Sequence, residues 1–481
     1  MFKIRRILAV ILAVFMILPC TACAQGDDPS DVTHADGTST NSESGTEFFP
    51  DIEKQDYNGA TFCIAGASDS GSWYLAKEYK TSGGDINVLN NTLFEMNSLV
   101  EEHLNVELVS GDTVGVPFET AIMSGDDVYQ ANMHLAYWDV APYISRNFVI
   151  DLNELDDLDF SQPYWNGDII EELTINDKAF VAVGDLCWSV LHMIYTNKDL
   201  METAGLKMPY DKVRNGEWTI DQLIAMTANL YMDDGDGLRN NTDTYGFVAG
   251  WADWGAILPQ AGNIFLASKN ADGGFDLTLY NDRTVEYYEK IYNWTRDESV
   301  KIWFYQAPAT EIVSFRNSQA YFFGDILGPG LLDVDFTVGI LPMPKYDTAQ
   351  ENYSHVNWGH ELTVPTTVKN RAMVGQVLEL MSFYSGTMVR EKYYDEVLQL
   401  RVSEAPDDRD MVEIIYNTVV YDPGMVYAHA NAGATGSLYP LVYTFYGCVE
   451  RGESNIASFY RTHGKAAQKQ LNNLVNKVSQ D

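Results

Sequence analysis

The 481-residue sequence contains 68 acidic and 31 basic residues, which gives a formal net charge of −37. A surface this negative repels nucleic acid and anionic lipid, so we expect no nucleic-acid partner. Hydrophobic residues make up 46% of the sequence and aromatic residues 12%. About 430 residues remain for folding once the N-terminal leader and the polar segment behind it are set aside, enough for two or three domain-sized units.

The leader predicts export. It begins with three basic residues, Lys3, Arg5 and Arg6. The apolar run at 7–18 is about a dozen residues, shorter than the roughly 20 that a spanning helix needs. A Thr-Ala pair directly before Cys23 resembles a bacterial lipobox, although Cys20 stands where Leu is usual. The resemblance implies that residues 1–22 are a lipoprotein signal peptide and that Cys23 is lipidated. The alternative is an ordinary secretory peptide that is cut nearby.

The segment that follows, residues 23–50, predicts a tether. It is acidic, rich in Ser and Thr, and almost without apolar residues before Phe48. Such a segment cannot bury enough apolar surface to offset its ordering entropy, so it should be disordered. We interpret it as a flexible link between a lipid and the folded body.

The body predicts alternating strands and helices. In chain order we expect a strand at 60–65, a helix at 88–103, strands at 105–109 and 133–137, a helix capped by Thr219, and a terminal amphipathic helix at 454–477. The apolar stripe of the helix at 88–103 is Leu89, Leu93, Met96 and Val100. Strands that alternate with helices indicate a layered α/β fold. In open sheets of this kind, ligands bind beyond the carboxyl ends of the strands.

Cysteine usage argues against a disulfide framework. Beyond the leader, the cysteines are Cys63, Cys187 and Cys448. Three is an odd number and the spacings are long, so neither a disulfide scaffold nor a zinc cluster is indicated. We expect buried free thiols.

Several stretches together resemble one family. They are 85–92 (DINVLNNT), 99–106 (LVEEHLNV), 149–155 (VIDLNEL), 163–166 (PYWN), 178–185 (KAFVAVGD), 194–200 (IYTNKDL), 217–219 (EWT), 338–346 (VGILPMPKY), 362–365 (LTVP) and 457–460 (ASFY). In this order, and spread over most of residues 60–475, they resemble the extracellular solute-binding proteins of bacterial ABC importers, of the large carbohydrate-binding type.

The resemblance implies an α/β, two-lobed periplasmic-binding-protein-like fold of type II. Each lobe would be a mostly parallel sheet flanked by helices, and the chain would cross the hinge several times. Residues 185–188 and 354–361 resemble the first two crossings. The implied lobes are discontinuous: 55–186 plus about 359–400, and 187–358 plus about 401–481. Hinge closure would trap ligand between them.

Sugar sites combine flat aromatic rings with side chains that form paired hydrogen bonds. The candidates with this chemistry near the expected cleft are Trp73, Trp138, Asp139, Asp185, Trp188, Trp251, Trp254, Asp325, Trp358, His360 and Glu361. Packing inside a lobe is the alternative for each Trp, because Trp is usually mostly buried. We assign Trp165, Trp218 and Trp294 to packing.

An acidic turn is a weak calcium candidate through Asp234, Asp236 and Asp243. If Gly237 is the sixth position of an EF-hand loop, the first position is Met232, which is a poor ligand. A plain acidic surface turn is the alternative. His355, His360 and Glu361 fit no zinc spacing, so we predict no metal and no cofactor.

The implied function is a monomeric, lipid-anchored receptor on the extracellular or periplasmic side of the membrane. It would bind a sugar or oligosaccharide without catalysis and deliver it to the permease subunits of an ABC transporter. Two alternatives remain. One is a surface glycosidase that uses two of the many carboxylates, and the other is a substrate sensor for a membrane kinase.

Overall fold

The computed structural model describes residues 49–480, except for 67–87, 112–115, 136–139, 188, 304–309, 327–333, 394–405 and 429–437. The predicted leader and residues 23–48 of the predicted tether lie outside the described residues. Within the described part, no helix is long and apolar enough to cross a membrane.

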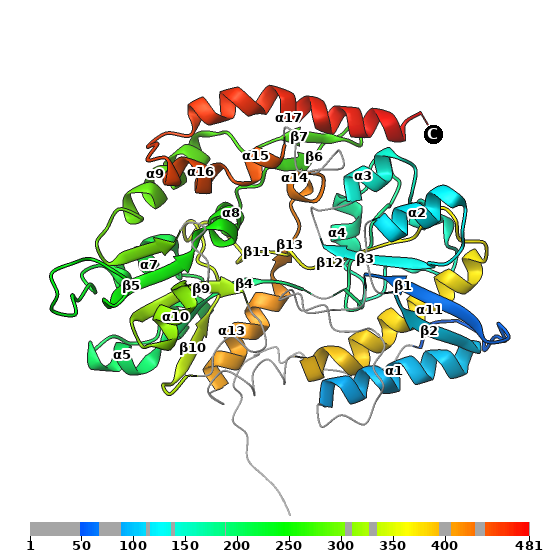
Figure 1. Cartoon of the computed structure of the whole chain (residues 1–481), viewed down its shortest axis with the longest axis horizontal. Helices are drawn as coiled ribbons and strands as arrows, with labels where there is room; N and C mark the ends of the chain where they lie inside the picture. The colour runs from blue at the N-terminus through cyan, green and yellow to red at the C-terminus, as the bar shows by residue number, and fades with distance from the viewer. Residues whose placement is uncertain are drawn as a thin grey trace, which may run out of the picture. The chain divides into compact units, whose positions relative to one another are not determined.

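Two sheets organise the described part (Figure 1). In order across the first sheet, the strands are β12 (His360–Thr363), β3 (Ala131–Leu135), β1 (Ala60–Ala65) and β2 (Val106–Ser110). β1 is parallel to β2 and β3, whereas β12 is antiparallel to β3. The three parallel strands lie within one or two residues of the predicted strands.

The second sheet contains five strands. In order they are β10 (Val338–Leu341), β4 (His192–Asn197), β9 (Ala320–Ile326), β5 (Tyr245–Gly250) and β8 (Val300–Trp303). β5 is parallel to β8 and β9, but β4 is antiparallel to both β9 and β10. The sheet is therefore mixed, because its parallel half is joined to an antiparallel half.

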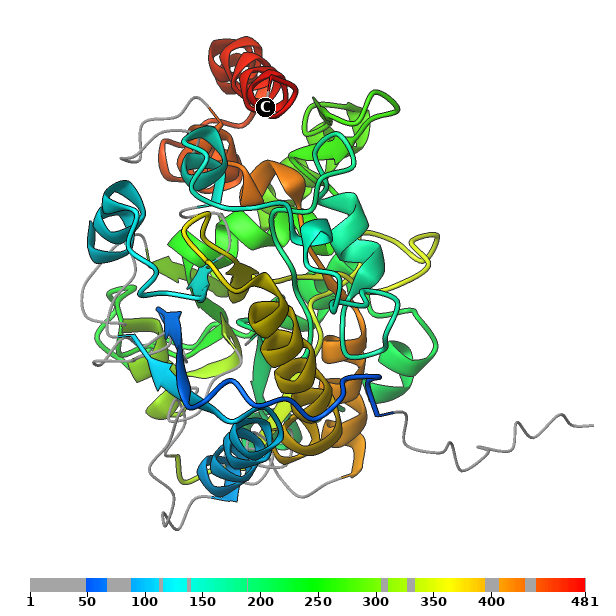
Figure 2. The ribbon, with the colours of Figure 1, turned by 90° about the vertical axis from the view of Figure 1, so that its right-hand side faces the viewer.

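Helices cover the first sheet. They are α1 (Val88–Leu104), α2 (Val116–Ser124), α3 (Val140–Ser145), α4 (Gly167–Glu172) and α11 (Arg371–Tyr384), which continues into a π-helical turn, η2 (Ser385–Val389). A short 3-10 turn, η1, spans Leu152–Glu154. α11 lies along α1, as Figures 1 and 2 show. The predicted stripe of α1 is buried.

A second set of helices and a small hairpin surround the second sheet. They are α5 (Lys198–Thr203), α6 (Tyr210–Arg214), α7 (Ile220–Thr227), α8 (Trp251–Ala261), α9 (Asp282–Trp294), α10 (Thr310–Arg316) and α13 (Pro406–Asn417), with the hairpin β6 (Ala267–Lys269) and β7 (Phe275–Leu277). The predicted cap of α7 is confirmed, because the Thr219 side chain accepts from the Gln222 N–H.

The chain ends in four helices: α14 (Pro423–Val426), α15 (Tyr439–Val442), α16 (Thr444–Glu450) and α17 (Ala457–Val478). α17 is the predicted terminal helix. It packs against β7, α15 and α16, and also against α3 beside the first sheet.

The chain passes between the sheets where the sequence predicts crossings. The first passage lies between Ala182, which bridges to β12, and His192, which begins β4. The return lies between β10 and β12 and includes β11 (His355–Val356). β11 pairs in parallel with β13 (Val419–Val420), and Figure 1 places this pair between the two sheets.

The cysteine and packing predictions are confirmed. Cys63, Cys187 and Cys448 are free and buried. Trp165, Trp218 and Trp294 are buried, and their indole N–H groups donate to Glu379, the Pro342 carbonyl and the Thr227 hydroxyl, respectively.

A buried carboxylate fixes the loop before α4. Glu379 of α11 is 2% exposed. It accepts hydrogen bonds from the Tyr164 hydroxyl at 2.5 Å, the Trp165 indole at 2.8 Å and the Asp159 N–H at 3.3 Å. One helical side chain therefore satisfies three donors of a loop that is distant in sequence.

We expect Glu379→Ala to destabilise the protein by about 2–5 kcal/mol, because it leaves two buried side-chain donors without an acceptor. Glu379→Gln keeps one carbonyl acceptor and should cost less. Urea unfolding measures both. The exposed Glu391→Ala is the control and should change stability by about 0.5 kcal/mol or less. Equal losses for Glu379→Ala and Glu391→Ala would contradict the anchoring role.

Candidate ligand-binding site at the hinge

Three segments meet at the side chain of Asn357, which is 3% exposed. Its Oδ1 accepts from the N–H groups of Val190 at 2.9 Å and Gly359 at 2.7 Å. Its Nδ2 donates to the Tyr421 hydroxyl at 2.5 Å, and its backbone N–H donates to the Val420 carbonyl at 3.0 Å. Asn357 therefore joins the first crossing, the second crossing and the segment of β13.

The two predicted crossings are also bonded directly to each other. The Trp358 N–H donates to the Val190 carbonyl at 3.1 Å. Ala182 and Leu362 exchange backbone hydrogen bonds of 3.0 and 2.9 Å. These bonds satisfy the backbone of Trp358 and Val190 between the sheets, and of Ala182 and Leu362 at the outer edge of β12, as buried polar groups require.

Two histidines lie at the carboxyl edges of the sheets, where ligands of α/β folds bind. His360 pairs with Leu135 at the end of β3, and His192 pairs with Ile326 at the end of β9. Both are buried, and their Nδ1 atoms have no hydrogen-bond partner among the described residues. Burial lowers the pKa of His360 to about 4 and that of His192 to about 3, so both are neutral near pH 7.

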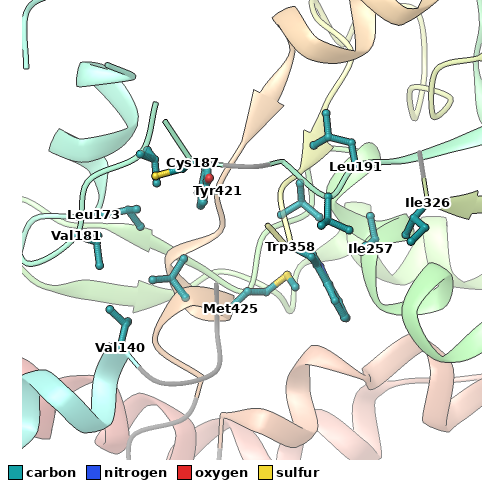
Figure 3. Close-up of a cluster of buried hydrophobic side chains, with 14 of the residues drawn as sticks. Val140, Leu173, Val181, Cys187, Leu191, Ile257, Ile326, Trp358, Tyr421 and Met425 are labelled. Carbon is teal, nitrogen blue, oxygen red and sulfur yellow. The ribbon is translucent and has the colours of Figure 1, made fainter. Parts of the chain in front are cut away.

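Trp358 precedes His360 by two residues and packs beside His192. Its side chain is 3% exposed, and its ring centroid is 6.1 Å from that of His192, in an edge-on arrangement. Figure 3 shows Trp358 in an apolar cluster that spans the hinge. The labelled members include Val140, Leu173, Val181 and Cys187 from the part of the chain around the first sheet, and Leu191, Ile257 and Ile326 from the part around the second.

Glu361 is an unusual buried acid. It is fully buried, and neither carboxyl oxygen has a hydrogen-bond partner in the part of the chain that the structure describes. Burial raises its pKa from 4.5 to about 8, so the group is mostly protonated at pH 7. Burial raises the pKa values of Cys187, Tyr421 and Tyr427, and the charge of ionised Glu361 adds to this rise. A buried carboxyl without partners costs about 1–3 kcal/mol, which a bound hydroxyl group can recover.

A pocket of about 270 Å³ lies beside the first crossing. Asp185, Cys187 and Ser189 contribute to its lining. The Asp185 carboxylate accepts from Arg390 at 3.1 Å and is 18% exposed. Burial raises the pKa of Asp185 to about 6, and the Arg390 charge opposes that rise. Val389 of η2, Arg390 and Tyr393 just beyond it, and Tyr416 and Asn417 at the end of α13 also line the pocket, so it borders both sets of elements.

Trp358, His360 and Glu361 are buried at the second predicted crossing, whereas Asp185, at the first, lines the 270 Å³ pocket, whose lining includes none of the other three. Asp325 is half-buried in β9, and its Oδ1 accepts from the Ile326 N–H at 2.7 Å. Trp251 and Trp254 occupy the start of α8, and their side chains are not part of the description. Trp73, Trp138, Asp139 and Trp188 lie outside the described residues.

Sequence reasoning missed Asn357, His192 and Tyr421. Asn357 precedes the Trp-Gly pair of the predicted second crossing, and a buried amide at a hinge was the available signal. The other two had no local signal, because their neighbours come from distant segments.

The acidic turn is divided by the structure. The carboxylates of Asp233, Asp234 and Asp236 are exposed and lie within 4.8 Å of one another. Asp243, by contrast, is buried and accepts from the N–H groups of Asp234 at 3.1 Å and Asn240 at 2.8 Å. Asp243 therefore stabilises the turn as an internal hydrogen-bond acceptor.

Comparison with known families gives one match. Residues 98–388, more than half of the chain, match the model of a family described as bacterial extracellular solute-binding protein. None of the curated proteins matches the chain.

Solved structures share the fold. The GacH receptor of Streptomyces glaucescens, solved unliganded and with acarbose, has a TM-score of 0.55 at 14% identity, covering 86% of this chain and 99% of that one. UspC of M. tuberculosis has a TM-score of 0.54 at 14% identity, with 85% and 100% covered. An ABC substrate-binding protein of Listeria monocytogenes in complex with cycloalternan has a TM-score of 0.50 at 16% identity, with 89% and 100% covered. At these identities the likeness shows the fold, which is the expected two-lobed periplasmic-binding type.

Glu361 predicts a pH-dependent stability. Because the folded-state pKa of about 8 lies above the ordinary 4.5, the native state binds more protons between these pH values. Stability should therefore fall as pH rises through this window. Glu361→Gln lacks this titration, so near pH 8 it should be more stable than wild type by a few kcal/mol, on the order of 1.4 kcal/mol per pKa unit.

Urea unfolding of wild type and Glu361→Gln from pH 4.5 to 8 tests this through the difference between the two curves. Asp185 and Asp422, whose pKa values burial raises to about 6, are common to both proteins and cancel. Curves that stay parallel would show that Glu361 keeps an ordinary pKa.

Proposed function

The chain belongs to the bacterial extracellular solute-binding proteins, and we propose that it captures a sugar or oligosaccharide between its two lobes for delivery to an ABC importer. The GacH receptor bound to acarbose and the Listeria protein bound to cycloalternan support a carbohydrate ligand. Capture would occur without catalysis, and the permease subunits would be separate proteins.

The observation that carries the proposal is the unpartnered carboxyl group of Glu361 at the hinge. With a pKa of about 8, Glu361 is neutral at pH 7 and can both donate and accept a hydrogen bond. The neutral imidazoles of His192 and His360 add acceptors and donors at the two sheet edges. Uncharged buried groups favour an uncharged, hydroxyl-rich ligand over a cationic peptide or polyamine, which would be paired with ionised carboxylates.

Aromatic rings supply the apolar half of such a site. Trp358 lies at the crossing, and we include Trp73, Trp138, Trp188, Trp251 and Trp254 as further stacking candidates, with Asp139, Asp185 and Asp325 as polar ones. Sugar rings present apolar faces that pack on flat side chains.

Lobe closure would complete the site. We assign residues 55–186 with about 359–400 to one lobe and 187–358 with about 401–481 to the other. Rotation about the segments tied by Asn357 would then bring the two sheet edges over the ligand.

The lipid anchor forms the second half of the proposal. Lipidation of Cys23 would hold the body at the membrane through the 23–50 tether. Such a tether raises the effective concentration of the receptor at the permease without any new contact.

We expect Trp fluorescence to change on titration with neutral mono- or oligosaccharides. Glu361→Ala should weaken the best ligand by about 10- to 100-fold, the value of roughly one to two hydrogen bonds to a buried group. Thr363→Val, two residues along the same strand, is the matched control and should change affinity by less than about threefold.

A flat response to all glycans, with a response to peptides or polyamines instead, would overturn the carbohydrate assignment. Reducing ends released during incubation with polysaccharides would identify a glycosidase, because a receptor releases none.

Mass spectrometry of the mature protein should find an acylated N-terminal Cys23. Cys23→Ser should move the protein from the membrane fraction to the soluble fraction, because one lipidated residue supplies the anchor. An unmodified N-terminus elsewhere in the leader would contradict the anchor while leaving the binding proposal intact.

A further inference from the structure

Among the described helices, α17 stands out because it contains several Lys and Arg residues and no acidic residue. Its 22 residues contain no Asp or Glu, in a chain that has 68. Arg461, Lys465 and Lys469 are spaced at i, i+4 and i+8, and all three are exposed. By helix geometry they form a stripe about 12 Å long on one face.

No other part of the described chain neutralises this basic stripe. None of the three side chains forms an ion pair with a described residue. The opposite face of α17, with Leu471 and Leu474, is buried. Gln468 fastens the helix to β7 through the Leu277 N–H and the Phe275 carbonyl, both at 2.8 Å.

The arrangement does not stabilise the helix. Like charges at i and i+4 repel each other, and no acid provides an i+4 partner. Arg461 also lies near the positive N-terminal end of the helix dipole. Because this charge pattern disfavours the helix, we attribute the basic stripe to an interaction with a partner outside the chain.

The surroundings add an exposed aromatic group. Tyr280 is 41% exposed and stacks on Tyr460, the neighbour of Arg461, with ring centroids 4.8 Å apart and planes 16° apart. Asp276 on β7 is exposed, and its carboxylate accepts from Asn270. In Figures 1 and 2, no described ribbon covers the side of α17 that faces away from β7.

We propose that the stripe of Arg461, Lys465 and Lys469 docks on an anionic phospholipid surface and orients the tethered receptor. Charge complementarity selects this occupant, and Tyr is a residue type enriched at membrane interfaces. The inference rests on the proposed lipid anchor, which holds the receptor close to the membrane surface.

The electrostatic attraction of the stripe is strong enough to orient a receptor that is already tethered, but not to bring a free receptor to the membrane. With a net charge of −37, the body as a whole is repelled by an anionic bilayer. At physiological salt, however, charges act over only about 8 Å. A body held by its tether is therefore attracted only where the stripe itself faces the lipid, and each cation favours that orientation by about fivefold, equivalent to about 1 kcal/mol.

Lysine labelling on vesicles tests the proposal. The chain from Cys23 onward is coupled through that thiol to a maleimide lipid, since Cys63, Cys187 and Cys448 are buried. Vesicles are either phosphatidylcholine alone or phosphatidylcholine with phosphatidylglycerol. A water-soluble acetylating reagent then labels exposed lysines, and mass spectrometry reads each site. Lys207 and Lys369, exposed elsewhere, are the internal references.

We expect Lys465 and Lys469 to label several-fold more slowly than the references on phosphatidylglycerol vesicles, and equally on phosphatidylcholine. High salt should abolish the difference. Arg461→Gln should reduce the orienting preference about fivefold, whereas Lys207→Gln, with the same change in charge, should leave it unchanged.

Equal relative labelling on both vesicle types would overturn the proposal. Protection seen only on native membranes, and not on pure lipid, would also overturn it and indicate an acidic protein partner. Because chemical coupling supplies the anchor, a Cys23 found unlipidated in cells would defeat the anchor proposal without altering this readout.

Discussion

The amide of Asn357 is the constraint on which the arrangement of the two sheets depends. One side chain accepts from the first crossing and from its own loop, and donates to Tyr421 beyond β13. An amide suits this position because it offers both acceptor and donor atoms, whereas a carboxylate offers only acceptors. The candidate ligand groups, His360 and Glu361, follow it within four residues. Their placement relative to His192 is therefore set by the same hydrogen bonds.

The protein separates its charge sharply between surface and interior. The chain carries a large net negative charge, yet four buried titratable groups of the hinge are mostly neutral near pH 7, since burial raises the pKa of Glu361 and lowers those of His192, His355 and His360. Surface charge keeps such a protein dispersed outside the cell. Neutral interior groups, in contrast, allow a polar uncharged solute to be desolvated without meeting an unpaired ion.

Local patterns predicted local structure well. The apolar stripe of α1, the Thr219 cap and the buried cysteines follow from short-range spacing and composition. The positions of the crossings followed from the family resemblance. The antiparallel half of the second sheet could not be predicted from local patterns. Its strand β4 pairs with β9 and β10, which lie far along the chain, and such pairing has no local sequence signature. The partners of Asn357 are likewise 64 and 167 residues away.

The pairing of β11 with β13 bears on how a solute enters and leaves. Two strands that share a ladder cannot twist independently, since rotation of one alone would break the backbone hydrogen bonds between them. The Trp358–Val190 bond adds the first crossing to the same assembly. These three segments are thus tied to one another, and the lobe rotation that we propose would have to move them together. Segments that are already ordered against one another would lose little further entropy in the proposed closure, which would leave more of the contact energy to hold a ligand.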